Sequence, residues 1–188
     1  TEVIDTMDTI NRQVDDIKNL VDEFSNFARM PAPNMQKYNI KDIIDNAISL
    51  FDLKSNKIVI DLDKKSLDHS IKCDESQINR VLNNLIINSI HSIESKYNNE
   101  SGGTIYIDAS LNDNYLKIKI FDNGQGLSHK EEDLLKPYFS TKEKNIGTGL
   151  GLSIVEKIIS EHGGNFHIYN LEDKSGACSE FTLRLFND

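Results

Sequence analysis

The stretch that decides the fold is Gly147-Thr-Gly-Leu-Gly-Leu-Ser153, a glycine-rich loop that leads into a helix. The apolar positions that follow it have helical spacing: Ile154, Val155, Ile158 and Ile159. Backbone N–H groups at such a helix start, together with the positive end of the helix dipole, form a site for phosphate. The sequence therefore predicts a phosphate-binding loop at 147–151 and a helix at about 150–162.

Two familiar phosphate loops do not fit this stretch. A Walker loop needs Gly-Lys-Ser/Thr, which this sequence lacks. A dinucleotide-binding fingerprint would have glycine in place of Leu152 and would follow a strand, but the polar segment Lys142-Glu-Lys-Asn145 precedes the loop. The loop must therefore belong to another fold.

The composition limits the class of protein. The 188 residues include 21 Lys plus Arg and 30 Asp plus Glu, a net charge of −9, with 38% apolar and 27% charged residues. This suits one globular domain with an appendage, and the acidity predicts no nucleic-acid partner and no membrane contact. The two cysteines, Cys73 and Cys178, have no metal-binding spacing and suit a reducing compartment.

Residues 1–30 have the pattern of a bundle helix. Their apolar positions alternate steps of four and three: Val3, Met7, Ile10, Val14, Ile17, Val21, Phe24 and Ala28. This stripe is expected to pack on a second copy, on a missing neighbouring helix or on the rest of the chain. Pro31 and Pro33 end the helix, so we expect a linker at 31–37 and a domain at 38–188.

The domain pattern predicts a two-layer α/β sandwich. Strands at 105–109 and 116–120 alternate apolar and polar residues, so each has one buried face, and helices are expected on one side of the sheet only. The remaining expected elements are helices at 40–51, 75–96 and 150–162 and strands at 57–61, 70–73, 165–170 and 179–186.

Two further motifs suggest a polar ligand. Asn84-Leu-Ile-Ile-Asn88 places two amides on one helical face, where their oxygens suit Mg²⁺ if phosphates supply the negative charge; satisfied core or capping amides are the alternative. Asp122-Asn-Gly-Gln-Gly126 follows a strand directly, and its carboxylate can accept a hydrogen bond from the exocyclic amine of adenine; an ordinary turn is the alternative. The segment between Gly126 and Gly147 is long enough to form a lid.

In this order, the motifs resemble the ATP-binding domain of the gyrase, Hsp90, histidine kinase and MutL superfamily. Asn84 to Asn88 resembles its N box, 122–126 its first G box, Phe139 its F box and 147–151 its second G box. The resemblance covers about residues 38–186 and implies the Bergerat fold, with a mixed sheet, ATP and Mg²⁺. One departure is Gly176-Ala-Cys-Ser-Glu-Phe181, where Cys178 stands at the second glycine of the last box.

The resemblance also implies roles for single residues. Asn88 coordinates Mg²⁺, Asn84 helps to place the phosphates, and Lys142 in the lid neutralises charge; these three form the expected catalytic set. A Lys that contacts phosphate often stands in relatives where this chain has His91. The residues expected to contact the nucleotide are Asn84, Asn88, His91, Asp122, Gly124, Gly126, Phe139, Thr141, Lys142, Gly147, Thr148, Gly149, Leu150 and Gly151.

Asn84 favours a kinase over a hydrolase. Members of the superfamily that hydrolyse ATP carry Glu at this position as general base, and an amide cannot accept a proton usefully near neutral pH. Val21 to Pro31 and Pro137-Tyr-Phe-Ser-Thr-Lys142 resemble the NtrY branch of sensor histidine kinases. A GHKL-type ATPase, an anti-sigma serine kinase and a non-catalytic nucleotide-binding dimerisation module are the alternatives.

The phosphoacceptor is expected upstream of this chain. None of the five histidines lies in the His-Glu context of the acceptor motif, and the chain begins at Thr1 inside a helical pattern, as a piece of a longer protein would. The resemblance implies a homodimer through the N-terminal helix and an NtrX-like response regulator as partner. It also implies a cytoplasmic location, with an inner-membrane anchor in segments outside this chain.

Overall fold

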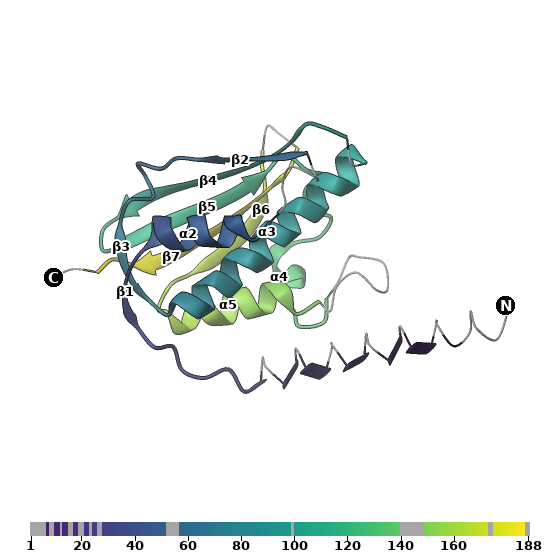
Figure 1. Ribbon diagram of the computed structural model, residues 1–188, viewed down its shortest axis with the longest axis horizontal. Helices are drawn as coiled ribbons and strands as arrows, with labels where there is room; N and C mark the ends of the chain where they lie inside the picture. The colour runs from purple at the N-terminus through teal and green to yellow at the C-terminus, as the bar shows by residue number, and fades with distance from the viewer. Residues whose placement is uncertain are drawn as a thin grey trace.

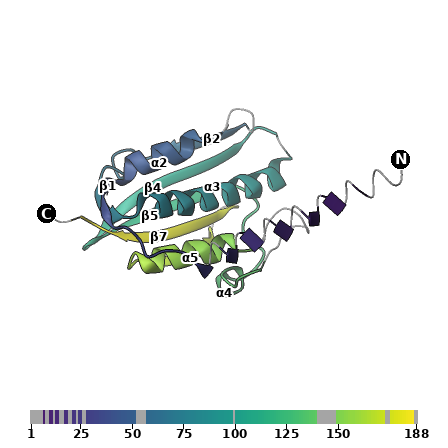
Figure 2. The same cartoon turned by 60° about the horizontal axis from the view of Figure 1, so that its bottom comes forward.

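The computed structural model describes residues 29–51, 57–98, 100–139, 149–172 and 175–186, together with part of the segment 7–28. Each residue described between 7 and 28 is helical. In Figures 1 and 2, these residues lead away from the domain that follows. No helix in the described ranges combines the length and the apolar character that a membrane crossing requires.

A five-stranded mixed sheet forms one layer of the domain. The strands are β2 (Ile58–Leu62), β4 (Gly103–Asn112), β5 (Tyr115–Asp122), β6 (Phe166–Asn170) and β7 (Ala177–Arg184). Their spatial order is β2-β4-β5-β7-β6, in which β2 runs parallel to β4 and the other pairs are antiparallel. The mixed sheet that the resemblance implied is confirmed.

Helices cover one face of this sheet, as Figure 2 shows. They are α2 (Ile40–Ser49), α3 (Glu75–Tyr97) and α5 (Gly151–Glu161), and α3 packs against both of the others. Ile105 and Ile107 point into this layer and are buried, whereas Tyr106 between them is exposed and stacks on Phe121 of the neighbouring strand at 5.1 Å. The two-layer sandwich predicted from alternating residues is therefore confirmed.

Two short elements were not predicted. Strand β1 (Gln36–Asn39) pairs antiparallel with β3 (Ser70–Cys73) in a separate two-stranded sheet. Its sequence, Gln-Lys-Tyr-Asn, has no apolar alternation, because the pairing depends on β3 and not on a buried face of its own. Helix α4 (Glu131–Leu134) is only four residues long and is too short to show a period.

The start of α3 is hydrogen-bonded to the end of α5 and to the linker. Asp74 caps the helix, since its Oδ1 accepts hydrogen bonds from Gln77 N (3.1 Å) and Ser76 Oγ (2.8 Å). The Asp74 backbone N–H donates to Nε2 of the buried His162 (3.0 Å), whose Nδ1 lies 2.8 Å from Ile158 O. His162 therefore ties the end of α5 to the start of α3.

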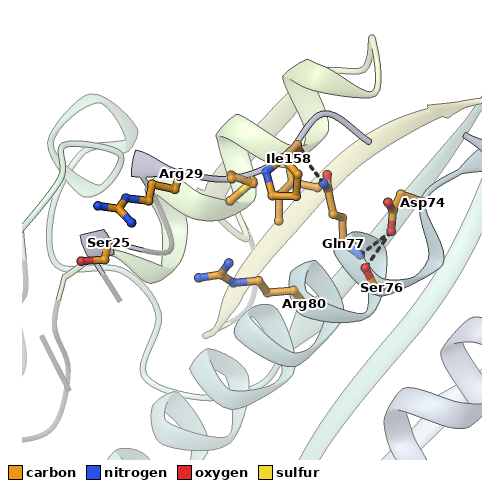
Figure 3. Close-up of a pocket in the computed structure, with 9 residues that line it drawn as sticks. Ser25, Arg29, Asp74, Ser76, Gln77, Arg80 and Ile158 are labelled. Carbon is orange, nitrogen blue, oxygen red and sulfur yellow. Dashed lines mark hydrogen bonds between the residues drawn. The ribbon is translucent and has the colours of Figure 1, made fainter. Parts of the chain in front are cut away.

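The linker after the N-terminal helix is held on the same helix start (Figure 3). Gln77 Nε2 donates to Pro31 O at 3.0 Å, and Asp74 Oδ2 accepts Asn34 N at 2.9 Å. A cavity of about 350 Å³ lies beside these contacts, and the Arg29 and Arg80 side chains border it. Two side chains of the domain thus fix the path of the linker.

Strand β6 lies at one edge of the five-stranded sheet, and side chains partly cover its outer edge. Glu131 Oε1 on α4 accepts a hydrogen bond from Ile168 N at 3.0 Å and lies 3.2 Å from His167 Nδ1. The Asn170 side chain, further along β6, is bonded to Leu127 through both its oxygen and its nitrogen. Side chains therefore occupy part of the hydrogen-bonding edge of β6.

We predict that Asp74→Ala destabilises the domain by about 1 kcal/mol, because the cap and the linker bond are lost together. The pKa of Asp74 is lowered: partial burial raises it, but hydrogen bonds from Asn34, Ser76 and Gln77 outweigh that effect. A lowered folded-state pKa stabilises the fold fully above the unfolded pKa, and this contribution disappears as the pH falls through the folded value.

Urea denaturation at pH 7 and at pH 3 measures this effect. The difference in unfolding free energy between wild type and Asp74→Ala should shrink at the lower pH. Asp45→Ala serves as a matched control, because Asp45 forms a partly exposed i,i+4 ion pair with Lys41 within α2. A difference that is equal at both pH values, or absent at both, contradicts the prediction.

Candidate functional site

The site begins with a polar stripe on α3. Asn84, Asn88 and Ser92 follow one another at four-residue spacing, so they lie one turn apart on one face, and each is half-buried. His91 is also half-buried and lies beside Asn88 on this side of the helix. Asn84 Nδ2 donates to Arg80 O at 2.8 Å, which turns the amide oxygen away from its own helix backbone.

The turn after β5 is clamped between β4 and α3. Asn123 Oδ1 accepts a hydrogen bond from Thr104 N (2.9 Å), and its Nδ2 donates to Gly102 O (2.8 Å). Gly124 lies directly on α3, because a Cβ added to it would be 2.2 Å from Ser92 Oγ. Gln125 N donates to Ser92 O at 3.1 Å. The turn therefore stays in place through backbone and side-chain contacts on both sides.

Asp122 is the buried acid of the site, with 4% of its surface exposed. Its Oδ1 accepts hydrogen bonds from Ser92 Oγ (3.1 Å) and Gly124 N (2.9 Å). Burial raises the pKa of this carboxyl, and hydrogen bonding from Gly124, Ser92, Ser89 and Ala177 works in the opposite direction. These donors favour the charged carboxylate, the form that accepts a hydrogen bond from an amine.

The start of α5 provides a second feature suited to a ligand. Leu150 at its N-cap position makes no side-chain capping hydrogen bond, and Ser153 Oγ donates to Leu150 O (2.8 Å). The first N–H groups of a helix have no carbonyl partner within the helix itself, so a helix start of this kind suits an anion. Gly151 lies against the α3 stripe, since a Cβ added there would be 2.8 Å from Asn84 Oδ1.

Tyr138 is hydrogen-bonded to Gly149, which lies just before the start of α5. Tyr138 N donates to Gly149 O at 3.0 Å, and Gly149 has a φ of +71°. A Cβ on Gly149 would lie 2.6 Å from the Tyr138 carbonyl carbon, so only glycine fits without displacement. The Phe139 ring packs edge-on against His129, with ring centroids 5.0 Å apart.

The structure brings Asp122 and Gly124 against Ser92 of the α3 stripe and Gly151 against Asn84, whereas Gly126 lies against Asn170 and Gly176 instead. The described members of the predicted site are Asn84, Asn88, His91, Asp122, Gly124, Gly126, Phe139, Gly149, Leu150 and Gly151. Thr141, Lys142, Gly147 and Thr148 lie outside the described residues. Sequence reasoning missed Ser89, Ser92 and Asn123; the repeat of polar residues every fourth position from Asn84 would have indicated Ser92.

Comparison with known proteins shows the family. Residues 73–187 match the family described as histidine kinase-, DNA gyrase B-, and HSP90-like ATPase. The chain belongs to this family.

The most informative relatives are sensor kinases. The nitrogen regulation protein NtrY of Azorhizobium caulinodans is 37% identical over 94% of this chain, and the match covers 23% of NtrY. The sensor histidine kinase ZraS of Salmonella typhimurium is 31% identical over 93% of this chain and 36% of its own length. The chain is a histidine kinase ATPase domain homologous to both, and it spans only a minor part of each.

Solved structures show the same fold. The catalytic domain of histidine kinase ThkA has a TM-score of 0.67 and 27% identity, and the match covers 81% of this chain and 96% of that domain. ThkA in complex with the response regulator TrrA has a TM-score of 0.72 over 95% of this chain and 50% of that one, at 23% identity. The resemblance predicted from the sequence motifs is confirmed.

We predict that Asp122→Ala weakens ADP binding at least about tenfold, because a hydrogen bond to a buried carboxylate is lost. Titration calorimetry with ADP measures the change. Asp108→Ala is the matched control: Asp108 is a half-buried acid of the same sheet, on β4. ADP affinity that is unchanged in Asp122→Ala would show that the site is assigned wrongly.

Proposed function

We propose that this chain is the catalytic part of a two-component sensor histidine kinase. It binds Mg-ATP and transfers the γ-phosphoryl group to a histidine upstream of this chain, for relay to an aspartate of a response regulator. The observation that carries the proposal is the pairing of a buried acceptor, Asp122, with an uncapped helix start at Gly151, both against one face of α3.

The two ends of this face suit the two ends of ATP. Asp122 accepts the exocyclic amine of adenine, and Gly124 and Gly126 let the backbone approach the base. The N–H groups of 149–151 lie on the phosphate side, with Asn84 next to Gly151. Thr141, Lys142, Gly147 and Thr148 complete the phosphate contacts in this proposal, with Phe139 at the base of the lid.

Asn88 suits Mg²⁺ by position and chemistry. It lies one turn from Asn84 and one turn from Ser92, between the phosphate side and the base side of α3. Bound Mg²⁺ would neutralise charge on the β- and γ-phosphates. A neutral amide oxygen is a sufficient protein ligand when the phosphates carry the charge, and His91 adds a phosphate contact on the next turn.

Transfer is favoured over hydrolysis because of Asn84. This amide donates to Arg80 O on one side and faces Gly151 on the other, so it is held beside the phosphate loop. An amide has no basic site to take a proton from water, whereas it can orient a phosphate. The domain therefore positions ATP for an external nucleophile and relies on orientation and electrostatics.

The N-terminal helix supports the proposal of a dimer. Its described apolar residues are unusually exposed: Met7 62%, Ile10 53%, Val14 57%, Ile17 64%, Val21 52% and Phe24 47%. A stripe with a 3.5-residue period and this exposure suits packing on a second helix. In this proposal it is the second helix of a dimeric phosphoacceptor hairpin, as in the NtrY branch. An NtrX-like regulator and a cytoplasmic domain below an inner-membrane anchor follow from the same assignment.

We predict that Asn88→Ala removes the effect of Mg²⁺ on ATP binding. ATP affinity measured in EDTA should stay within about twofold of wild type, whereas the gain on adding Mg²⁺ should disappear because the metal loses its protein ligand. Asn79→Ala, on the same helix and outside the stripe, is the control. A normal Mg²⁺ effect in Asn88→Ala would exclude Asn88 as the metal ligand.

A second prediction concerns the nucleophile. This chain, incubated with γ-labelled Mg-ATP, should not label itself, because its five histidines lie outside an acceptor motif. Addition of a polypeptide that supplies the upstream helix should yield an acid-labile, base-stable phosphoprotein. Self-labelling with that stability would contradict the assignment of the acceptor, and steady phosphate release without any phosphoprotein would indicate an ATPase.

A further inference from the structure

One oxygen of Asp122, Oδ1, is held from two sides. Asp122 Oδ1 accepts hydrogen bonds from Ser92 Oγ at 3.1 Å and from Gly124 N at 2.9 Å. Neither of these bonds involves Oδ2. Oδ1 is thus held by α3 and by the turn after β5, and hydrogen bonding from Ser89 and the Ala177 backbone also reaches this carboxylate.

Ser92 contacts the turn after β5 through both its side chain and its backbone. Its hydroxyl lies so close to the turn that a Cβ on Gly124 would be 2.2 Å away, and its carbonyl accepts Gln125 N at 3.1 Å. The carbonyl contact belongs to the backbone and survives any change of side chain. Replacing the side chain therefore removes the hydroxyl without releasing the turn from α3.

We propose that Ser92 is a positioning residue for base recognition: its hydroxyl, together with the Gly124 amide, holds Asp122 Oδ1 and so directs Oδ2 toward the exocyclic amine of the base. This rests on the proposed function, in which Asp122 reads adenine. The buried Ser89, one turn earlier on the inner side of α3, also favours the charged carboxylate.

The consequence is a selectivity for amino-purines. A charged Oδ2 held toward the base attracts an amine and repels a carbonyl oxygen at the same position. Hypoxanthine differs from adenine at this position, where it carries an oxygen. A loosely held or protonated carboxyl would lose this preference, because it can turn away or donate a proton to the oxygen.

The test compares ADP with IDP by titration calorimetry, on the whole chain without Mg²⁺. Wild type should prefer ADP. In Ser92→Ala, ADP affinity should fall about tenfold while IDP affinity changes by less than about twofold, because the lost bond acts only through the amine contact. Ser92→Cys keeps the size of the side chain but has a weak donor, so it should shift the preference in the same direction.

Ser66→Ala is the matched control. Ser66 Oγ accepts Ala109 N (3.0 Å) and donates to Asp63 O (2.9 Å), so this variant also loses hydroxyl bonds but lies outside the site. Equal weakening of ADP and IDP in the Ser92 variants, or an unchanged preference, would overturn the role of Ser92. A wild-type chain that binds ADP and IDP alike would instead refute the assignment of Asp122 to adenine.

Discussion

Helix α3 must bury one side and leave the other side accessible, and the rest of the domain is arranged around this helix. Its apolar side, with Val81, Leu85 and Ile86 fully or almost fully buried, must pack on the sheet, because this burial drives folding. Its polar side must remain open to a ligand. A single helix satisfies both demands only if α2 and α5 cover its flanks and leave the Asn84 stripe between α5 and the turn after β5.

This constraint explains why glycines surround the helix. Gly124 and Gly151 both lie where a side chain would strike the polar stripe, one against Ser92 and the other against Asn84. They are small because two segments must approach α3 closely from either side. The glycine motifs visible in the sequence are therefore requirements of packing as well as of ligand approach.

Most of the fold was predictable from the sequence, since amphipathic periods identify elements that bury one face. Strand β1 was not, because its four residues take their conformation from β3 and not from their own pattern. In the site, the glycine loops and the Asn84–Asn88 pair are visible as motifs. Ser92 and Asn123 were missed, because short polar residues are common and only the three-dimensional turn shows what they bind.

The total charge of the domain and its local electric field act differently on an anion. A chain with a net charge of −9 would repel a polyanion at long range. At short range, the uncapped start of α5 offers backbone N–H groups whose partial positive charge does not depend on any basic side chain. A carboxylate kept buried at the other end of the same face repels phosphate, which in the proposed site favours one orientation of a nucleotide.

The side chains along the edge of β6 also affect how copies of the molecule can meet. Sheets of neighbouring molecules often join through unpaired edge strands, which leads to aggregation. Here Glu131 already occupies the central outward amide of that strand, and Asn170 ties its end to Leu127. A second molecule cannot extend the sheet at Ile168 without displacing a carboxylate, so this edge resists fibril-like growth.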